Sequence, residues 1–266
     1  MKIGILGKGV VGSAIEAGFL ELGHDVKFYD PKYADSKFEN ILDTEVCFIC
    51  VPTPPTDSGE CDISIVADSV HQLDKQYYTG VVAIKSTVTP GTTESLSARY
   101  PTLQLAFVPE FLRERCAVVD FIENHDVCVI GTHNESSFEV IKNAHGTYPN
   151  QFVMVSPTEA EMVKYYNNIY NATLIILANS FYEVCKATGA DYSKVKNALV
   201  NRKHISNSYL QCNENFRGFG GVCLPKDTLA IAALVEQKNL DISFFKTLID
   251  ENNKYKTTVY EGMRPQ

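Results

Sequence analysis

The stretch KIGILGKGVVG (residues 2–12) decides the fold. Its apolar start, residues 2–6, predicts a short strand, and its G-x-G-x-x-G turn opens an amphipathic helix that we expect over residues 13–22. A second strand, expected over residues 25–29, ends in Asp30. A strand, a glycine turn, a helix and a second strand in this order predict a Rossmann unit that binds a dinucleotide.

The glycines matter because they let the backbone and the helix N-terminus approach a pyrophosphate closely. An acid at the tip of the second strand accepts a hydrogen bond from a ribose hydroxyl. A carboxylate there also favours NAD over NADP, because it repels a 2′-phosphate. We therefore expect NAD as the cofactor, bound by Gly7, Gly9, Val10, Val11, Gly12 and Asp30.

Further strand patterns alternate with helical or irregular connections and occur at residues 46–51, 81–85, 104–109 and 127–131. This alternation predicts an α/β fold with a doubly wound parallel sheet. Ligands of such sheets bind beyond the carboxyl ends of the strands. Three polar clusters fall at those ends, PTPPT (52–56), STVTPG (86–91) and PEFLRE (109–114). The proline run is also typical of a simple turn, whereas Glu110 and Glu114 suit either a water-activating base or a solvated acidic face.

From residue 156 the pattern changes to helical periodicity, so we expect a Rossmann domain over residues 1–155 and a helical domain over 156–266. A long central helix is expected over residues 158–188. Its residues Lys164, Asn168 and Asn171 form one stripe, which faces either solvent or a cleft. Shorter helices are expected at 191–200, 228–237 and 241–255, followed by a frayed tail at 261–266.

The loop GFGGVCLPKD (residues 218–227) combines three glycines with one cysteine. Glycines free the backbone for close approach to a ligand, and the thiol then sits at the point of approach. A helix start and the nearby Lys226 are two reasons for Cys223 to be a nucleophile. The alternative is a glycine-rich surface loop with a structural cysteine.

Composition excludes several classes of function. The 266 residues carry a formal net charge of −8 and a sequence pI near 5.3, without a basic run, which argues against a nucleic-acid partner. There is no apolar stretch of membrane-spanning length and no signal-peptide pattern at the N-terminus, so we expect a cytoplasmic protein with no membrane partner. The eight cysteines lie mostly in apolar contexts, which is typical of reduced thiols, and no metal site is expected.

With these motifs in order, the chain resembles the UDP-glucose and GDP-mannose dehydrogenases, a family of nucleotide-sugar dehydrogenases, up to about residue 240. The shared motifs are G-x-G-x-x-G at 7–12, VPTP at 51–54, KSTV at 85–88, PEFLRE at 109–114, K-x-x-x-N at 164–168 and GFGG-x-C-x-PKD at 218–227. The Pro-Glu-Phe-Leu form is similar to the UDP-glucose or GDP-mannose branch of the family.

The resemblance implies oxidation of a sugar primary alcohol to a carboxylate with two NAD, through a thiohemiacetal and a thioester on Cys223, with UDP-glucose as the expected substrate. It implies catalytic roles for Cys223, Lys164, Asn168, Asp227, Glu114, Glu110 and Thr87. It adds Pro52, Thr53, Thr87, Glu114 and Lys226 to the cofactor-binding residues. It implies substrate contacts from Phe111, Leu112, Arg113, Glu114, Lys164, Asn168, Phe219, Gly220 and Cys223, and a homodimer through the central helix.

The chain departs from the family pattern in length, because relatives continue into a second Rossmann-like domain that holds the nucleotide end of the substrate. Two other functions therefore stay open. The layout also resembles 3-hydroxyacid dehydrogenases, which transfer one hydride and need no cysteine. The other alternative is a noncatalytic NAD-binding or dimerisation module.

Overall fold

The computed structural model describes residues 1–255 and divides into two compact units. Unit 1 comprises residues 1–54 and 61–164, and unit 2 comprises residues 55–60 and, of the described chain, 165–255. The predicted tail at 261–266 lies outside the described residues. Each unit is described by itself.

Unit 1 is built on a seven-stranded sheet with the order β2-β1-β3-β4-β5-β6-β7. Its strands are β1 (Lys2–Leu6), β2 (Asp25–Tyr29), β3 (Val46–Ile49), β4 (Val81–Ile84), β5 (Gln104–Phe107), β6 (Val127–Gly131) and β7 (Gln151–Val155). Neighbours pair in parallel except β5 and β6, which meet antiparallel at the single pair Phe107 and Gly131. The sheet is therefore mostly parallel, and the predicted doubly wound α/β fold is confirmed with that one correction.

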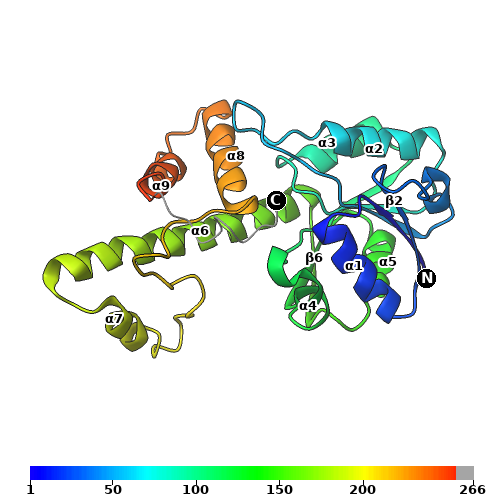
Figure 1. The fold of residues 1–266 in the computed structure, drawn as a ribbon. Coiled ribbons are helices and arrows are strands. Elements are labelled where there is room, and N and C mark those ends of the chain that lie inside the picture. The colour runs from blue at the N-terminus through cyan, green and yellow to red at the C-terminus, as the bar shows by residue number, and fades with distance from the viewer. Residues whose placement is uncertain (256–266) are drawn as a thin grey trace. The chain divides into compact units, whose positions relative to one another are not determined.

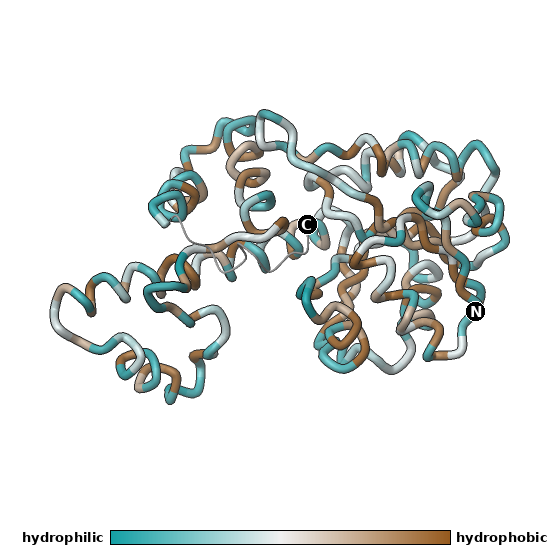
Figure 2. Tube along the Cα trace, viewed as in Figure 1, coloured by the Kyte–Doolittle hydropathy of each residue, from teal (hydrophilic) through white to brown (hydrophobic). Residues whose placement is uncertain are grey.

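Helices cover both faces of this sheet (Figure 1). They are α1 (Val10–Glu21), α2 (Ser64–Lys75), α3 (Thr92–Arg99), α4 (Ala117–Ile122) and α5 (Glu135–His145), with short 3-10 turns η1 (Phe38–Ile41) and η2 (Glu114–Cys116). One apolar cluster packs the sheet against α2 and α3, and a second packs it against α1, α4 and α5. Figure 2 shows the resulting concentration of hydrophobic residues in the strands.

The strand β3 illustrates why these runs are continuously apolar. Cys47 and Ile49 belong to the cluster under α2, whereas Val46 and Phe48 belong to the cluster under α1. Both faces of a parallel sheet are covered, so every position of the strand is buried. The alternation also places Cys47 and Cys50, which are three residues apart, in different clusters.

The helix α6 (Pro157–Thr188) begins in unit 1 and continues through unit 2, which adds α7 (Tyr192–Leu199), α8 (Cys223–Gln237) and α9 (Phe244–Asn252). Tyr165 and Ile169 of α6 pack against Ala230 and Ile231 of α8 and Leu248 of α9. The other half of α6 packs against α7 through a separate cluster that includes Cys185 and Cys212. Among residues 1–255, no helix has the length and hydropathy needed to cross a membrane.

Several element boundaries differ from the sequence expectation, among them α9, which is shorter than the helix expected over residues 241–255, and one strand was not expected. The helix α8 begins at Cys223 instead of residue 228, because Pro225 lies in its first turn, where no backbone N–H is needed. The helix α1 begins at Val10, so half of the glycine motif is helical. The strand β7 was not expected, because an edge strand that is only half-buried lacks a continuous apolar run.

A buried histidine lies in the core under α1. His145 is fully buried, its Nδ1 lies 2.8 Å from the Ile141 carbonyl oxygen, and its Nε2 has no hydrogen-bond partner within residues 1–255. The rings of Phe19, Phe48 and Phe121 pack around it with centroid distances of 5.5 to 5.7 Å. Burial, with a smaller contribution from the charge of Lys85, lowers the pKa of His145 well below its usual value.

We predict that the free energy of unfolding falls as the pH is lowered below about 6.5, because the unfolded chain then binds a proton that buried His145 does not. One such group contributes at most about 1.4 kcal/mol per pH unit. Urea unfolding at pH 7 and pH 5 should show a smaller difference for His145→Phe than for the wild type. His71→Phe on α2, where the side chain is exposed, is the matched control. Equal pH dependence in all three proteins would contradict the prediction.

Candidate active site

The glycine loop between β1 and α1 has the geometry of a phosphate cradle. Gly7 has a φ of +89°, and a Cβ on it would lie 2.7 Å from the Cys50 carbonyl oxygen. A Cβ on Gly12 would lie 2.0 Å from the Gly7 carbonyl oxygen. A Cβ on Gly9, the N-cap residue of α1, would meet no heavy atom within 4 Å, and Gly9 itself has no side chain with which to cap the helix. Two glycines thus permit the turn, and the third leaves open space at a helix N-terminus.

Asp30 follows β2 and is held beside this loop. Its Oδ2 accepts a hydrogen bond from the Lys8 N–H at 2.8 Å, and its Oδ1 accepts one from the Lys32 N–H at 2.9 Å. The Nζ of Lys8 is engaged with Glu16 at 2.8 Å and lies 3.8 Å from the centroid of the Phe28 ring. The open helix N-terminus and the fixed carboxylate together fit the pyrophosphate and ribose of a dinucleotide.

The loops that carry Thr53 and Thr87 are joined by a cysteine. Both threonines are half-buried, while Pro52 is exposed. The Sγ of Cys61 donates a hydrogen bond to the Thr87 carbonyl oxygen at 3.1 Å and lies 3.7 Å from the Thr53 carbonyl oxygen. Cys61 therefore links the two loops at the carboxyl ends of β3 and β4.

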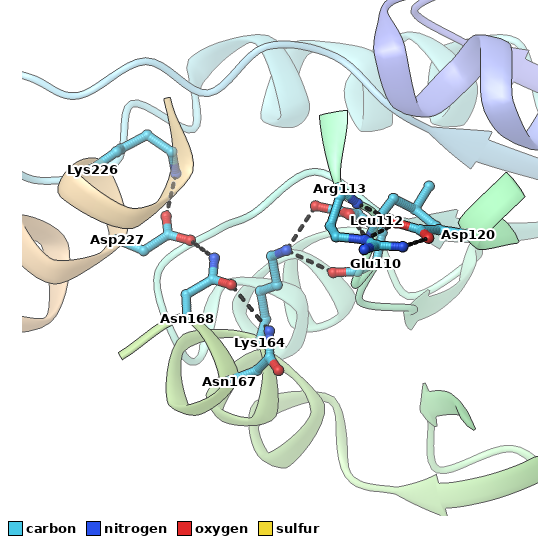
Figure 3. A network of polar contacts seen from close by, with 9 residues as sticks. All are labelled: Glu110, Leu112, Arg113, Asp120, Lys164, Asn167, Asn168, Lys226 and Asp227. Carbon is cyan, nitrogen blue, oxygen red and sulfur yellow. Dashed lines mark hydrogen bonds and ion pairs between the residues drawn. The ribbon is translucent and has the colours of Figure 1, made fainter. Parts of the chain in front are cut away.

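A buried ion pair joins α6 to the loop after β5. The Nζ of Lys164 lies 2.7 Å from Oε1 of Glu110 and 2.6 Å from the Glu110 carbonyl oxygen (Figure 3). The two side chains are only 5% and 11% exposed. Burial favours a raised pKa for Glu110, but the charge and hydrogen bond of Lys164, the Leu112 N–H and the charge of Lys85 outweigh it, and the pKa lies below its usual value. Glu110 is therefore a carboxylate at neutral pH.

The rest of the PEFLRE loop is fixed by a second carboxylate. Arg113 donates from Nε and Nη2 to Asp120 at 2.9 and 2.6 Å, and its backbone N–H donates to the same side chain at 2.8 Å. These bonds from Arg113 hold the pKa of Asp120 well below its usual range. The predicted substrate-binding residue Arg113 thus has an ion-pair partner within the protein. Phe111 and Leu112 are half-buried against the two cores of the sheet, and Glu114 is exposed at the start of η2.

In unit 2, Asp227 connects α8 to α6. Asn168 donates from Nδ2 to Oδ2 of Asp227 at 2.5 Å, and Lys226 pairs through Nζ with Oδ1 at 2.6 Å (Figure 3). Asp227 is fully buried and Lys226 is 9% exposed. A buried carboxylate is strongly destabilising unless it is paired, so these two donors neutralise it. Lys226, predicted to bind the cofactor, is paired with Asp227.

The cysteine loop ends at the first residue of α8. Cys223 is the one cysteine with an exposed side chain; the other seven are buried or half-buried. Phe219, by contrast, is 3% exposed and packs in the core between α6, α8 and α9, with Gly220 half-buried beside it. The loop therefore presents the Cys223 thiol and uses Phe219 as an anchor.

Two polar residues were missed by the sequence analysis as parts of the site. Glu161 lies three residues before Lys164 and is fully buried, and its carboxylate accepts hydrogen bonds from Gly91 N–H at 2.5 Å and from Thr93 N–H at 2.8 Å. Glu161 thus caps the N-terminus of α3. It also extends the polar stripe on α6, and its spacing of three residues from Lys164 is the sequence signal that could have identified it. Lys85 is 4% exposed, and burial lowers its pKa.

Comparison with known proteins identifies the class. Residues 32–148 match the NAD-binding domain of the UDP-glucose/GDP-mannose dehydrogenase family, and residues 158–254 match its central domain. The chain belongs to this family, and NAD is the cofactor of its Rossmann unit.

Individual relatives agree with this assignment. The chain is 30% identical to a UDP-glucose dehydrogenase from Pyrobaculum islandicum, with a TM-score of 0.86 over 95% of this chain and 68% of that one. It is 32% identical over 229 residues to the UDP-glucose 6-dehydrogenase of Rickettsia prowazekii, covering 81% of this chain and 52% of the relative. A 3-hydroxyisobutyrate dehydrogenase from Mycobacterium tuberculosis, 13% identical, shares the fold with a TM-score of 0.73 over 95% of this chain and 92% of that one. The chain spans about half the length of the curated relatives it matches.

We predict that Gly9→Ala and Gly12→Ala fail for different reasons. Ala at position 9 fits the backbone and adds a methyl group to the open cradle, so NAD affinity measured by calorimetry should fall at least ~10-fold, about 1.4 kcal/mol, with little change in melting temperature. Ala at position 12 collides with backbone, so it should cost about 1–3 kcal/mol of stability or more. A Gly9→Ala protein that binds NAD like the wild type would contradict the cradle assignment.

Proposed function

We propose that the protein oxidises the C6 alcohol of a nucleotide sugar to a carboxylate, with UDP-glucose converted to UDP-glucuronate. The observation that carries this proposal is the exposed Cys223 thiol at the first residue of α8, followed within one turn by the buried Lys226 and Asp227 pair. A dehydrogenase that stops at the aldehyde has no use for a nucleophile of this kind. The two relatives compared above, named for UDP-glucose oxidation, support the choice of sugar.

NAD, when bound, accepts a hydride in each of two oxidations. In the first, the C6 alcohol loses a hydride and a proton and becomes an aldehyde. The Cys223 thiol then loses its proton as the sulfur forms a bond to the aldehyde carbon, and the aldehyde oxygen takes up a proton to give a thiohemiacetal. Loss of a second hydride and a proton gives a thioester, and water cleaves its carbon–sulfur bond to release the carboxylate and the thiol. In balance, one sugar alcohol, one water and two NAD⁺ give one sugar carboxylate, two NADH and three protons.

We assign to Lys164 and Asn168 the role of stabilising the negative charge that develops on oxygen during these steps. A positive charge and an amide donor stabilise an oxyanion most when they are already oriented. Glu110 orients Lys164 through two contacts of 2.6 and 2.7 Å, and Asp227 orients Asn168 through one of 2.5 Å. Each assigned residue is thus held by a carboxylate that is itself buried and ionically paired.

Hydrolysis of the thioester needs a base that activates water. We assign this step to Glu114, which is exposed, with Thr87 and Glu110 in support. The remaining expected contacts to sugar, from Phe111, Leu112 and Gly220, stay proposals of the same kind, as do the cofactor contacts of Pro52 and Thr53. The eight thiols of the structure support a cytoplasmic setting for the reaction, because disulfides are rare there.

We predict two NADH per UDP-glucose consumed, measured by absorbance at 340 nm together with chromatographic quantitation of the sugar nucleotide. Cys223→Ala should lose the formation of UDP-glucuronate by at least ~10³-fold, because no thioester forms. Cys185→Ala, which removes a buried sulfur from α6, is the matched control and should keep the stoichiometry of two. GDP-mannose serves as the competing substrate.

Other outcomes would support the alternatives. One NADH per substrate, unaffected by Cys223→Ala, would indicate a single-hydride dehydrogenase of the 3-hydroxyacid type. NAD binding without turnover of either sugar nucleotide would indicate a binding module. The assay uses saturating sugar nucleotide, so that weak substrate binding is not mistaken for lost chemistry.

We also infer that a second copy of the chain covers one face of α6. Five exposed apolar side chains on this helix are three, four or seven residues apart and form one stripe, Tyr166, Tyr170, Leu177, Phe181 and Val184. At 1.5 Å per residue the stripe is about 27 Å long. Apolar residues also recur along α6 in Figure 2. A continuous exposed patch of this kind marks an interface, and a two-fold axis lets the same stripe pack against itself.

The double variant Leu177→Glu, Phe181→Glu should therefore be monomeric under conditions where the wild type is a dimer, because two pairs of like charges would be buried in the interface. Light scattering after size exclusion gives the mass. The control is Ile65→Glu on α2. Ile65 is exposed to a similar extent as Leu177 and Phe181, so this substitution should leave the dimer intact. A monomeric wild type at micromolar concentration would refute the interface.

A further inference from the structure

Within the glycine loop before Cys223, the backbone of Phe219 is held by an asparagine of α9. Asn252, the last residue of α9, accepts a hydrogen bond from the Phe219 N–H at Oδ1, at 2.7 Å, and donates from Nδ2 to the Phe219 carbonyl oxygen at 2.9 Å. Both polar backbone groups of Phe219 are thereby satisfied by one amide side chain. This two-point contact resembles the pairing of neighbouring strands and fixes position as well as direction.

The residues just before Phe219 are fixed as well. The Gly218 N–H donates to Oδ1 of Asn179 at 3.2 Å, and Nε of Arg217 donates to the same oxygen at 2.8 Å. The guanidinium of Arg217 lies between the rings of Tyr182 and Tyr255, 4.7 and 4.8 Å from their centroids. It also pairs with Glu183.

The backbone at Gly218 and Phe219 is closely packed, so it has little room to move. Gly218 has a φ of +64°, and a Cβ on it would lie 2.8 Å from Oδ1 of Asn252. Phe219 itself is buried in the core of unit 2. Only three residues, Gly220, Gly221 and Val222, then separate the anchor from Cys223, and they are half-buried or exposed.

A three-residue connection between two fixed ends determines where the chain enters α8. One end is Phe219, held by Asn252, and the other is the first turn of α8, where Asp227 is buried between Lys226 and Asn168. A shift of Phe219 is therefore passed on to Cys223, because the linker is too short to absorb it. We propose that Asn252 is a positioning residue for Cys223, acting through the backbone of Phe219. This inference rests on the proposed function, in which the Cys223 thiol is the nucleophile.

The test compares Asn252→Asp with Asn253→Asp. Both changes add the same charge at neighbouring positions, but Asn253 is exposed and its side chain does not bond the loop. In Asn252→Asp, a carboxylate oxygen replaces the Nδ2 donor and faces the Phe219 carbonyl oxygen, so one attraction becomes a repulsion. Asn252→Ala removes both hydrogen bonds without adding charge and serves as the second variant.

Three quantities are measured on the full chain, below the melting temperature of every variant. The first is the rate at which iodoacetamide alkylates Cys223, followed by mass spectrometry of its peptide. The second is the split between kcat and the KM for NAD in UDP-glucose oxidation. The third is NAD affinity by calorimetry, which reports on unit 1.

We expect both Asn252 variants to alkylate Cys223 at least threefold more slowly and to lose at least tenfold in kcat, with NAD affinity and the KM for NAD unchanged. Slower alkylation follows because a thiol displaced from a helix N-terminus is a weaker nucleophile. Asn253→Asp should match the wild type in all three. The proposal is overturned if folded Asn252→Ala is alkylated at Cys223 at the wild-type rate. It is also overturned if Asn253→Asp shows the same losses in alkylation rate and kcat as the Asn252 variants. The alkylation comparison needs no turnover, so it decides this inference even if the wild type oxidises no sugar nucleotide.

Discussion

A polar side chain that is buried must be paired, and the inward polar stripe of α6 organises the structure around this constraint. In unit 1, Glu161 accepts hydrogen bonds from the N-terminus of α3, and Lys164 forms an ion pair with Glu110. In unit 2, Asn168 donates a hydrogen bond to Asp227. Each partner belongs to a loop or helix that carries a motif of the family. Within each unit, the part of α6 that belongs to it thus holds a distant motif of the same unit in place.

Much of the fold could be predicted because its signals are local. The strand β1, the glycine turn and β2 were expected at the residues where they occur, since apolar runs, glycine and a terminal acid are all read from neighbouring positions. The start of α8 was placed five residues too late, because Pro225 is a helix breaker in sequence and a tolerated first-turn residue in the structure. The edge strand β7 was missed because its burial depends on the pairing with β6.

The candidate site, like the fold, has parts that could be predicted from local sequence and parts that could not. Residue types such as Lys164 and Asp227 were recognisable from their motifs, but their partners depend on tertiary distances that no spacing reveals. Arg113 and Lys226 show the consequence, because both were expected at a ligand and both are paired with an aspartate in the protein. Each of these charged residues neutralises an aspartate, and that aspartate holds a loop or an amide in place.

The eight cysteines show how burial selects one nucleophile. Burial raises the pKa of Cys50 and of Cys128 to about 12 and that of Cys212 to about 11, so these thiols stay protonated at neutral pH. A protonated thiol is a poor nucleophile, and a buried one is also out of reach. Cys223 differs by being exposed at a helix N-terminus, after a loop whose anchor is buried. The chemistry therefore depends on a loop that is rigid at Phe219 and open four residues later.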